Sequence, residues 1–375
     1  MKSQLYTTDL TRFLFFVFIL LLCFPAYSQK KKKSRKSIFE TLQYKDVVGV
    51  IIETDLDSLI NYRNRDTYQK GTFSYANEKG KVFNHKIKLR PRGKFRRRIC
   101  DFPMIKIDFP KKVLKEHGYT KHDDYKLVTH CLNNALAAYE NIAREFLAYK
   151  LYNILSPNSY QVQFLYFTYI DTKEKIDPIQ QIGFIIEDTA ELEDRVFGEV
   201  RKETAGLLQD SFDIEQHDFV ALFQNMIGNT DWTAYPIPRN VKAIKYDDED
   251  KYKLIPFDFD FSGLVSSPYA VPRISLNQRN IRQRIFQGIS KDPTILQPTV
   301  AHFLSKKKYI LRTIKRYKFL SKQSKKDVLN YIESFFENLE KGYPWGLKYA
   351  KLDICLLYTS PSPRDATLSR MPSSA

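Results

Sequence analysis

The chain has 375 residues, with 60 basic and 43 acidic side chains, a formal net charge of +17, four cysteines and 14% aromatic residues. So much aromatic surface has to be buried in a folded core, which excludes a disordered or collagen-like chain. At roughly 150 residues per domain, the length allows two or three folding units or one large two-lobed domain.

The N-terminus predicts a secretory signal peptide over residues 1–28. Basic residues precede a short apolar run, 13–24, and Ala26 and Ser28 form a cleavage site with small residues at alternate positions. An uncleaved membrane anchor is the alternative, but the run is shorter than the ~20 residues that a spanning helix needs. We therefore expect export to a periplasm, a cell envelope or the exterior.

Two further segments are expected to lie outside the fold. Residues 29–36 form a basic tether without apolar periodicity, which is typical of a linker that stays close to anionic surfaces. Residues 355–375 resemble the translation of a transposase sequencing adapter, so we exclude them from the fold and leave the natural C-terminus open. Between these segments only Cys100 and Cys131 remain, either as one disulfide or as two reduced or buried thiols.

The sequence between these segments predicts strands first and helices later. Alternating or β-branched residues predict strands at 47–52, 82–89, 104–109, 161–170, 181–187, 241–246 and 252–257, with a turn-rich connection at 71–80. Spacings of three and four predict helices at 134–155, at 219–227 and from 280 almost to 341. This order favours a two-lobed α+β domain, with a strand-rich lobe at 37–190 and a lobe of loops and helices at 191–354.

Four polar residues in the second lobe, three of them aspartates, are the main candidates for a metal-binding or catalytic site. Asp258 and Asp260 lie where an apolar strand ends, and residues two apart on an extended chain project to the same side. They are therefore candidate ligands of a hard cation such as Mg²⁺, which shares its coordination with water and phosphate. Solvated aspartates in a turn are the alternative. Upstream, Asp231 and Asn240 flank a loop and are a candidate base and second metal ligand, although alone they are typical of an ordinary Asx-rich turn.

The stretch from Lys81 to Arg98 carries nine lysines and arginines without one acidic residue. Within it, Arg92 and Gly93 predict a phosphate cradle, because a glycine lets backbone N–H groups approach a ligand. Lys106 in the next strand is expected to point into a cleft. The alternatives are a solvated or nucleic-acid-binding face for the arginines and an exposed lysine at Lys106. The histidines show no zinc spacing or catalytic triad, which disfavours a zinc site and a hydrolase.

Taken in order, these signals resemble the CotH kinase family, the spore-coat type of secreted protein-kinase-like fold. The resemblance implies a two-lobed protein-kinase-like fold that phosphorylates protein serines with ATP and a divalent metal. It covers about residues 45–265 and rests on the following motifs: Arg92-Gly93, strand 104–109, the helix with Arg144, Glu145 and Tyr149, Gly183 to Glu187, Gly228 to Trp232, and Pro256 to Asp260.

The resemblance also implies roles for single residues. Asp258 would bind the metal with Asp260 accessory to it, and Asp231 would accept or orient the proton of the substrate hydroxyl. For the nucleotide, Lys106 would pair the phosphates, Glu145 would hold that lysine, and Glu187 would lie near the adenine.

The chain departs from the family pattern at three points. Pro236 stands where an asparagine is expected, so that Asn240 is displaced as a second metal ligand. Residues 94–98 replace a serine-rich stretch, and Glu140 competes with Glu145 as the partner of the lysine.

We therefore expect an exported atypical kinase that transfers phosphate from ATP or another nucleotide, with Mg²⁺ or Mn²⁺, to a protein or envelope hydroxyl. The displaced asparagine keeps a second class of protein open. This is a non-catalytic envelope protein of the same fold, which uses its basic lobe to bind anionic polymers or a membrane surface. Nucleic acid is the least favoured partner, because export argues against it.

Overall fold

In a computed structural model of the whole chain, the structure describes residues 35–132, 134–203 and 205–341. Its contacts divide the chain into two units, residues 1–35 and 36–375. The expected signal peptide, the tether up to residue 34 and the adapter-like tail lie outside the described residues. None of the helices in the described ranges combines the length and the apolar character that crossing a bilayer requires.

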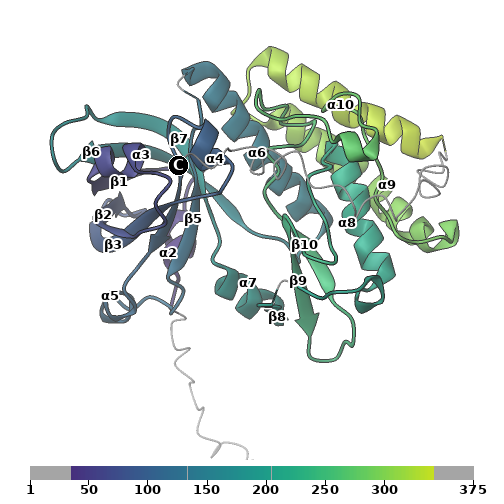
Figure 1. Cartoon of the computed structure of the whole chain (residues 1–375), viewed down its shortest axis with the longest axis horizontal. Coiled ribbons are helices and arrows are strands. Elements are labelled where there is room, and N and C mark those ends of the chain that lie inside the picture. Colours follow the sequence, from purple (N-terminus) through teal and green to yellow (C-terminus); the bar gives the residue numbers. More distant parts are fainter. Residues whose placement is uncertain (1–34, 133, 204, 342–375) are drawn as a thin grey trace, which may run out of the picture. The chain divides into compact units, whose positions relative to one another are not determined.

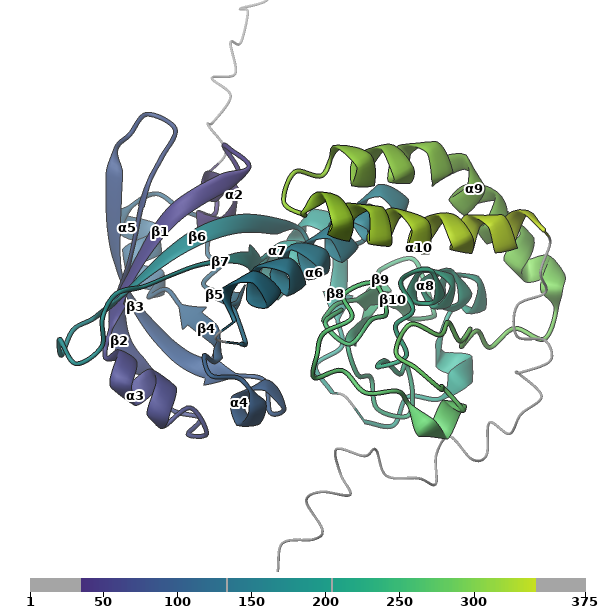
Figure 2. The same ribbon diagram turned by 90° about the horizontal axis from the view of Figure 1, so that it is seen from above.

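Seven strands close into a barrel in the order β1-β2-β3-β4-β5-β7-β6 (Figures 1 and 2). Neighbouring strands run antiparallel except β1 and β6, which are parallel and close the barrel. The strands are β1 (Val47–Thr54), β2 (Gln69–Ala76), β3 (Val82–Arg92), β4 (Met104–Asp108), β5 (Asp124–Val128), β6 (Val162–Asp171) and β7 (Ile179–Ile186).

The closed barrel shows that the prediction of a two-lobed protein-kinase-like fold is wrong, whereas the mixed α+β class fits the structure. Residues 71–80, expected as a turn-rich connection, contribute most of β2 and its turn. Gly71 is needed there for a close strand contact, since a Cβ atom would lie 2.5 Å from Leu89 Cδ2 and 2.8 Å from Glu53 O. The sequence pattern marks strands, but closure depends on partners that lie far apart in the chain.

The alternation along β3 decides where its basic residues lie. Ile87 and Leu89 are buried inside the barrel, while the alternate residues Lys86 and Lys88 are exposed on its outer face. Arg90 lies directly opposite Lys106 of β4, and Lys106 lies opposite Lys126 of β5. Residues opposite each other in antiparallel strands share a face, so these three cations project from the outer surface of the barrel.

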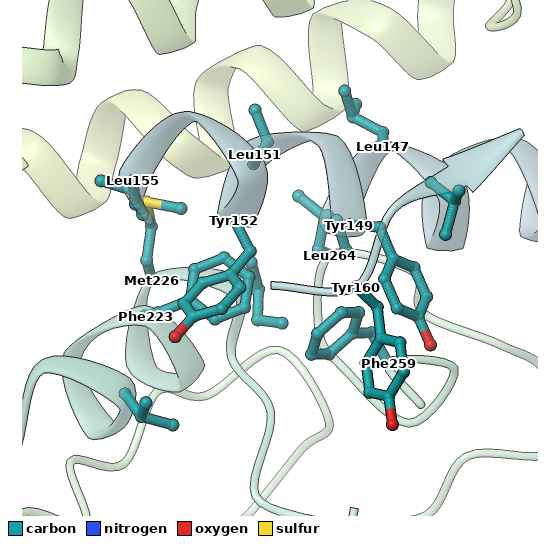
Figure 3. Close-up of a cluster of buried hydrophobic side chains, with 14 of the residues drawn as sticks. Leu147, Tyr149, Leu151, Tyr152, Leu155, Tyr160, Phe223, Met226, Phe259 and Leu264 are labelled. Atoms are coloured by element: carbon teal, nitrogen blue, oxygen red, sulfur yellow. The ribbon is translucent and has the colours of Figure 1, made fainter. Parts of the chain in front are cut away.

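The helix α6 (Ala135–Leu155) organises a second core outside the barrel, and it confirms the helix predicted over 134–155. Its N-cap is Asn134, whose side-chain oxygen accepts a hydrogen bond from Ala137 N at 3.0 Å. Figure 3 shows Leu151 and Leu155 of α6 above Phe223 and Met226 of the helix α8 (Ile214–Ile227).

The remaining helices pack partly against the barrel core and partly against this second core. The helical pattern expected from residue 280 begins at Pro293. The remaining helices are α2 (Ile38–Leu42), α3 (Leu56–Asn61), α4 (Arg96–Ile99), α5 (Lys111–Glu116), α7 (Thr189–Val196), α9 (Pro293–Arg316) and α10 (Lys322–Glu340), with 3₁₀ turns at Gln209–Ser211 and Ile274–Leu276. A small sheet has the order β10-β9-β8, from β8 (Gly198–Val200), β9 (Val241–Tyr246) and β10 (Lys253–Pro256).

Cys100 and Cys131 form a disulfide between the end of α4 and the segment that leads into α6. We predict that changing both to alanine lowers the free energy of unfolding by about 2–4 kcal/mol, because the bond restricts the unfolded chain over a sequence separation of 31 residues. Urea unfolding monitored by circular dichroism measures this. The wild-type protein under reducing conditions should match the variant, and equal stability of the variant and the oxidised protein would contradict the prediction.

Candidate functional site

The side chain of Arg96 joins three distant segments of the chain through buried ion pairs. Its Nε donates to Asp260 Oδ2 at 2.9 Å, and its NH2 donates to Glu145 Oε2 at 2.9 Å. These side chains come from α4, from the loop after β10 and from α6, and all are at most 6% exposed. Burial alone lowers the pKa of Arg96, but Asp260, Tyr269 and Glu145 raise it well above its ordinary value. The guanidinium therefore keeps its charge and fixes both carboxylates.

Asp258 lies two residues after the end of β10 and carries the least satisfied carboxylate of the site. Its backbone N donates to Tyr149 Oη at 2.9 Å, and its φ of 63° lies in the left-handed region. Within the described ranges, no hydrogen bond or ion pair reaches its carboxylate. Burial, followed by the neighbouring Asp260 carboxylate, raises the pKa of Asp258 to about 7, although Arg96 opposes this. A bound cation would restore the charged form.

Asp231 and Asn240 lie beside Asp258, at one end of the β9–β10 hairpin. Asn240 Nδ2 donates to Asp231 Oδ2 at 3.0 Å and to its backbone oxygen at 2.7 Å. Asn240 O accepts from Phe257 N at 3.0 Å, and Val241 pairs with Pro256 in the sheet. The amide of Asn240 thus orients the Asp231 carboxylate, while its own Oδ1 has no hydrogen-bond partner in the part of the chain that the structure describes.

Three basic side chains, Arg92, Lys126 and Lys242, form what we call the cation cluster. Lys126 Nζ lies 5.4 Å and Lys242 Nζ lies 5.8 Å from the centre of the Phe257 ring, directly before Asp258. None of the three makes an ion pair within 4.0 Å among the described residues. Burial, together with repulsion from Arg92 and Lys242, lowers the pKa of Lys126 to about 7. Unpaired cations held together in this way are a candidate binding site for an anion with several charges.

The donors at this site fit a hard divalent cation only if further ligands come from a bound phosphate. Asp258 and the Oδ1 atom of Asn240 offer the oxygen ligands that Mg²⁺ and Mn²⁺ prefer. Yet no three His, Cys, Asp or Glu side chains of the described residues come together as a metal-binding group. The remaining ligands would be phosphate oxygens and water, which the cation cluster is placed to attract.

Most of the residues singled out in the sequence meet at this site. Asp231, Asn240 and Asp258 lie at one end of the hairpin, and Asp260 and Glu145 meet at Arg96. The carboxylate of Asp260 is occupied by Arg96, so it supports the site instead of presenting a free oxygen. Arg92 contacts Met104 Sδ through its NH1 at 3.8 Å, and Gly93 adopts a φ of 80°, a conformation that favours glycine.

Three other predicted contacts take a different form in the structure. Lys106 Nζ lies 2.6 Å from Asp124 Oδ2, whereas Glu145 pairs with Arg96. Glu187 accepts two hydrogen bonds from Arg195 and one from Gln161 N, so its carboxylate is fully engaged. The competing carboxylate, Glu140, accepts from Ser321 N at 3.2 Å instead of reaching the site.

Sequence reasoning missed Lys126, Lys242 and the central role of Arg96. Lys126 is the one basic residue between apolar neighbours in β5, a strand that the sequence analysis did not predict. A lysine in such an environment is a signal that could have been used, because an isolated charge in a half-buried strand needs a reason. Arg96 belongs to a run of three arginines, and only the fold distinguishes this buried residue from the half-buried Arg97 and the exposed Arg98.

No model of a known protein family matches this chain, and no curated protein matches it in sequence.

Proposed function

We propose that this protein transfers a phosphoryl group from ATP or another nucleotide to a hydroxyl group of a protein or envelope component, with Mg²⁺ or Mn²⁺. The observation that supports this most is the unpaired cation cluster beside the unpaired carboxylate of Asp258. Phosphoryl transfer depends mainly on positioning and charge neutralisation. The basic side chains would attract the phosphate oxygens, and the carboxylate would bind the divalent metal.

Different residues of the chain have separate roles in this reaction. Arg92, Lys126 and Lys242 would bind the phosphates, and Asp258 with Asn240 would hold the metal, which would neutralise charge on the phosphate oxygens. Asp231, oriented by Asn240, accepts the proton of the acceptor hydroxyl. The bond between the hydroxyl oxygen and phosphorus forms while the bond from phosphorus to the bridging oxygen of the nucleotide breaks, so the nucleotide leaves with one phosphate fewer.

Two lysine variants distinguish this site from the one that the sequence favoured. We predict that Lys126→Met weakens nucleotide binding about ten- to a hundredfold, because it removes a charge-assisted contact to phosphate. Lys106→Met should change the affinity less than about threefold, since Asp124 already occupies its ammonium group. Thermal stabilisation by ATP with Mn²⁺, titrated over nucleotide concentration, measures both.

Two results would contradict this proposal. A wild-type protein that neither gains thermal stability from the nucleotide nor transfers labelled phosphate would rule out the proposed function. A larger loss of affinity in Lys106→Met than in Lys126→Met would remove the cation cluster from the phosphate site.

A non-catalytic protein that binds anionic polymers is the second candidate. The observation in its favour is the exposed outer face of β3, with Lys86 and Lys88. Salt-sensitive retention on an anionic polymer, lost in Lys86→Ser/Lys88→Ser and combined with no effect of nucleotide, would support it. Arg96 is unsuitable for such a test, because it is buried in its ion pairs.

A further inference from the structure

Five basic residues form a second charged region on the outside of α4, which we call the arginine surface. It comprises Arg63, Arg65, Lys94, Arg97 and Arg98. Their side chains make no ion pair with a carboxylate among the described residues, and Lys94, Arg65 and Arg98 are exposed. The arginine surface is distinct from the cation cluster, in which Lys126 and Lys242 lie over the Phe257 ring.

Two segments are fixed against each other to make this surface. Arg63, in the loop between α3 and β2, donates from Nε to Arg97 O at 3.0 Å, and Arg97 NH1 donates back to Asn64 O at 3.2 Å. Figure 2 shows α3 and α4 side by side. These bonds to backbone carbonyls hold the guanidinium groups of Arg63 and Arg97 in place, so less conformational entropy of these two side chains is lost when a ligand binds.

Two exposed tyrosines flank the arginines in the same loop. Tyr62 is 49% and Tyr68 is 43% exposed, and the Arg65 guanidinium lies 4.3 Å from the centre of the Tyr62 ring. The acid within this loop, Asp66, pairs with Arg90 and leaves the arginine surface uncompensated. Exposed aromatic rings beside fixed guanidinium groups are typical of a protein-binding surface.

We propose that the arginine surface binds an acidic peptide segment, rich in Asp or Glu, of a partner protein. The planar guanidinium group matches a carboxylate with two parallel hydrogen bonds. One loop and one short helix form the surface, which suits a short peptide better than a long nucleic-acid duplex. Arg96 of the same helix contacts Asp260, so the bound segment lies close to the candidate site. That this segment belongs to the phosphate acceptor rests on the proposed function, whereas the binding itself does not.

Fluorescence anisotropy with the full chain and a short labelled Glu-Gly peptide tests the proposal, with the matching Gln-Gly peptide as the neutral probe. We expect the wild-type protein to bind only the acidic peptide, with an affinity that falls as salt is added. Arg65→Glu/Arg98→Glu should weaken the binding at least about tenfold. Lys308→Glu/Lys326→Glu, which makes the same change in net charge at exposed positions of α9 and α10, should change it less than about twofold.

Equal losses in the two variants would overturn the proposal, because they would indicate a non-specific charge effect. Tighter binding of inorganic polyphosphate or duplex DNA at equal charge concentration would also overturn it, in favour of a phosphate polymer. Nucleotide stabilisation should be the same in the Arg65/Arg98 variant and the wild type. Peptide binding without any nucleotide effect would refute the proposed function and leave this proposal standing, whereas a nucleotide effect without peptide binding would do the opposite.

Discussion

Replacing Asp258 by asparagine should reduce metal-dependent phosphate transfer about a thousandfold while the protein stays folded. The change keeps the size of the side chain and removes its charge, so the proposed metal would lose Asp258, the carboxylate that does not pair with Arg96. Transfer of labelled phosphate in the presence of Mn²⁺ measures the loss, and thermal unfolding of the variant checks the fold.

Asp248→Asn is the matched control for this substitution. Asp248 is exposed in the turn at the other end of the same β9–β10 hairpin, far from the unpaired cations. Its replacement should leave transfer unchanged within about twofold. Transfer that survives in Asp258→Asn would show that Asp258 is not the metal ligand.

The pH dependence of metal binding follows from the same group. Burial and the neighbouring Asp260 raise the pKa of Asp258 to about 7, so below this pH a proton has to leave before a cation binds. The affinity for Mn²⁺ should therefore rise between about pH 6 and about pH 8 and level off above.

Nucleotide binding without metal should show the opposite pH dependence. The pKa of Lys126 is lowered to about 7, so its ammonium group loses its charge as the pH rises and binding should weaken between about pH 6 and about pH 8.

Replacing Arg96 by methionine should lower the free energy of unfolding by about 3–5 kcal/mol, the largest change in stability that we expect from a single substitution. The variant leaves the carboxylates of Asp260 and Glu145 buried without their guanidinium partner. Urea unfolding of both proteins at neutral pH gives the difference.

Arg98→Met in the same short helix provides the control, because Arg98 is exposed and makes no ion pair among the described side chains. It should change the free energy of unfolding by less than about 0.5 kcal/mol. Adding Glu145→Gln and Asp260→Asn to Arg96→Met should recover part of the loss, since uncharged side chains are less costly to bury. A stability of Arg96→Met close to that of the wild type would show that the ion pairs are not buried in solution.

Local pattern predicted the elements that depend on neighbours in sequence. The helix over 134–155 follows from apolar spacing and matches α6, and the hairpin of β9 and β10 follows from two strands around a polar turn. Asp258 is also recognisable from sequence as a candidate site residue, because a charge between phenylalanines at the end of a strand is unusual.

Contacts between distant segments could not be predicted from local pattern. The barrel depends on β1 meeting β6, and nothing in the pattern of either strand specifies the other. Arg96, Arg97 and Arg98 are equivalent in sequence, yet one is buried against Asp260 and the others lie at the surface. In the same way, Lys106 and Lys126 share a face of the barrel, but only the position of Phe257 places Lys126 in the site.

The parallel pairing of β1 with β6 has a consequence for the order of folding as the protein is made. β1 can pair with β2 soon after both leave the ribosome, but its other edge waits for a partner that begins at Val162. Contacts between such distant segments slow folding, and an open strand edge promotes aggregation until it is covered. Because β7 stands between β5 and β6 in the barrel, completion of β7 is the step of synthesis at which the nascent barrel first becomes able to close.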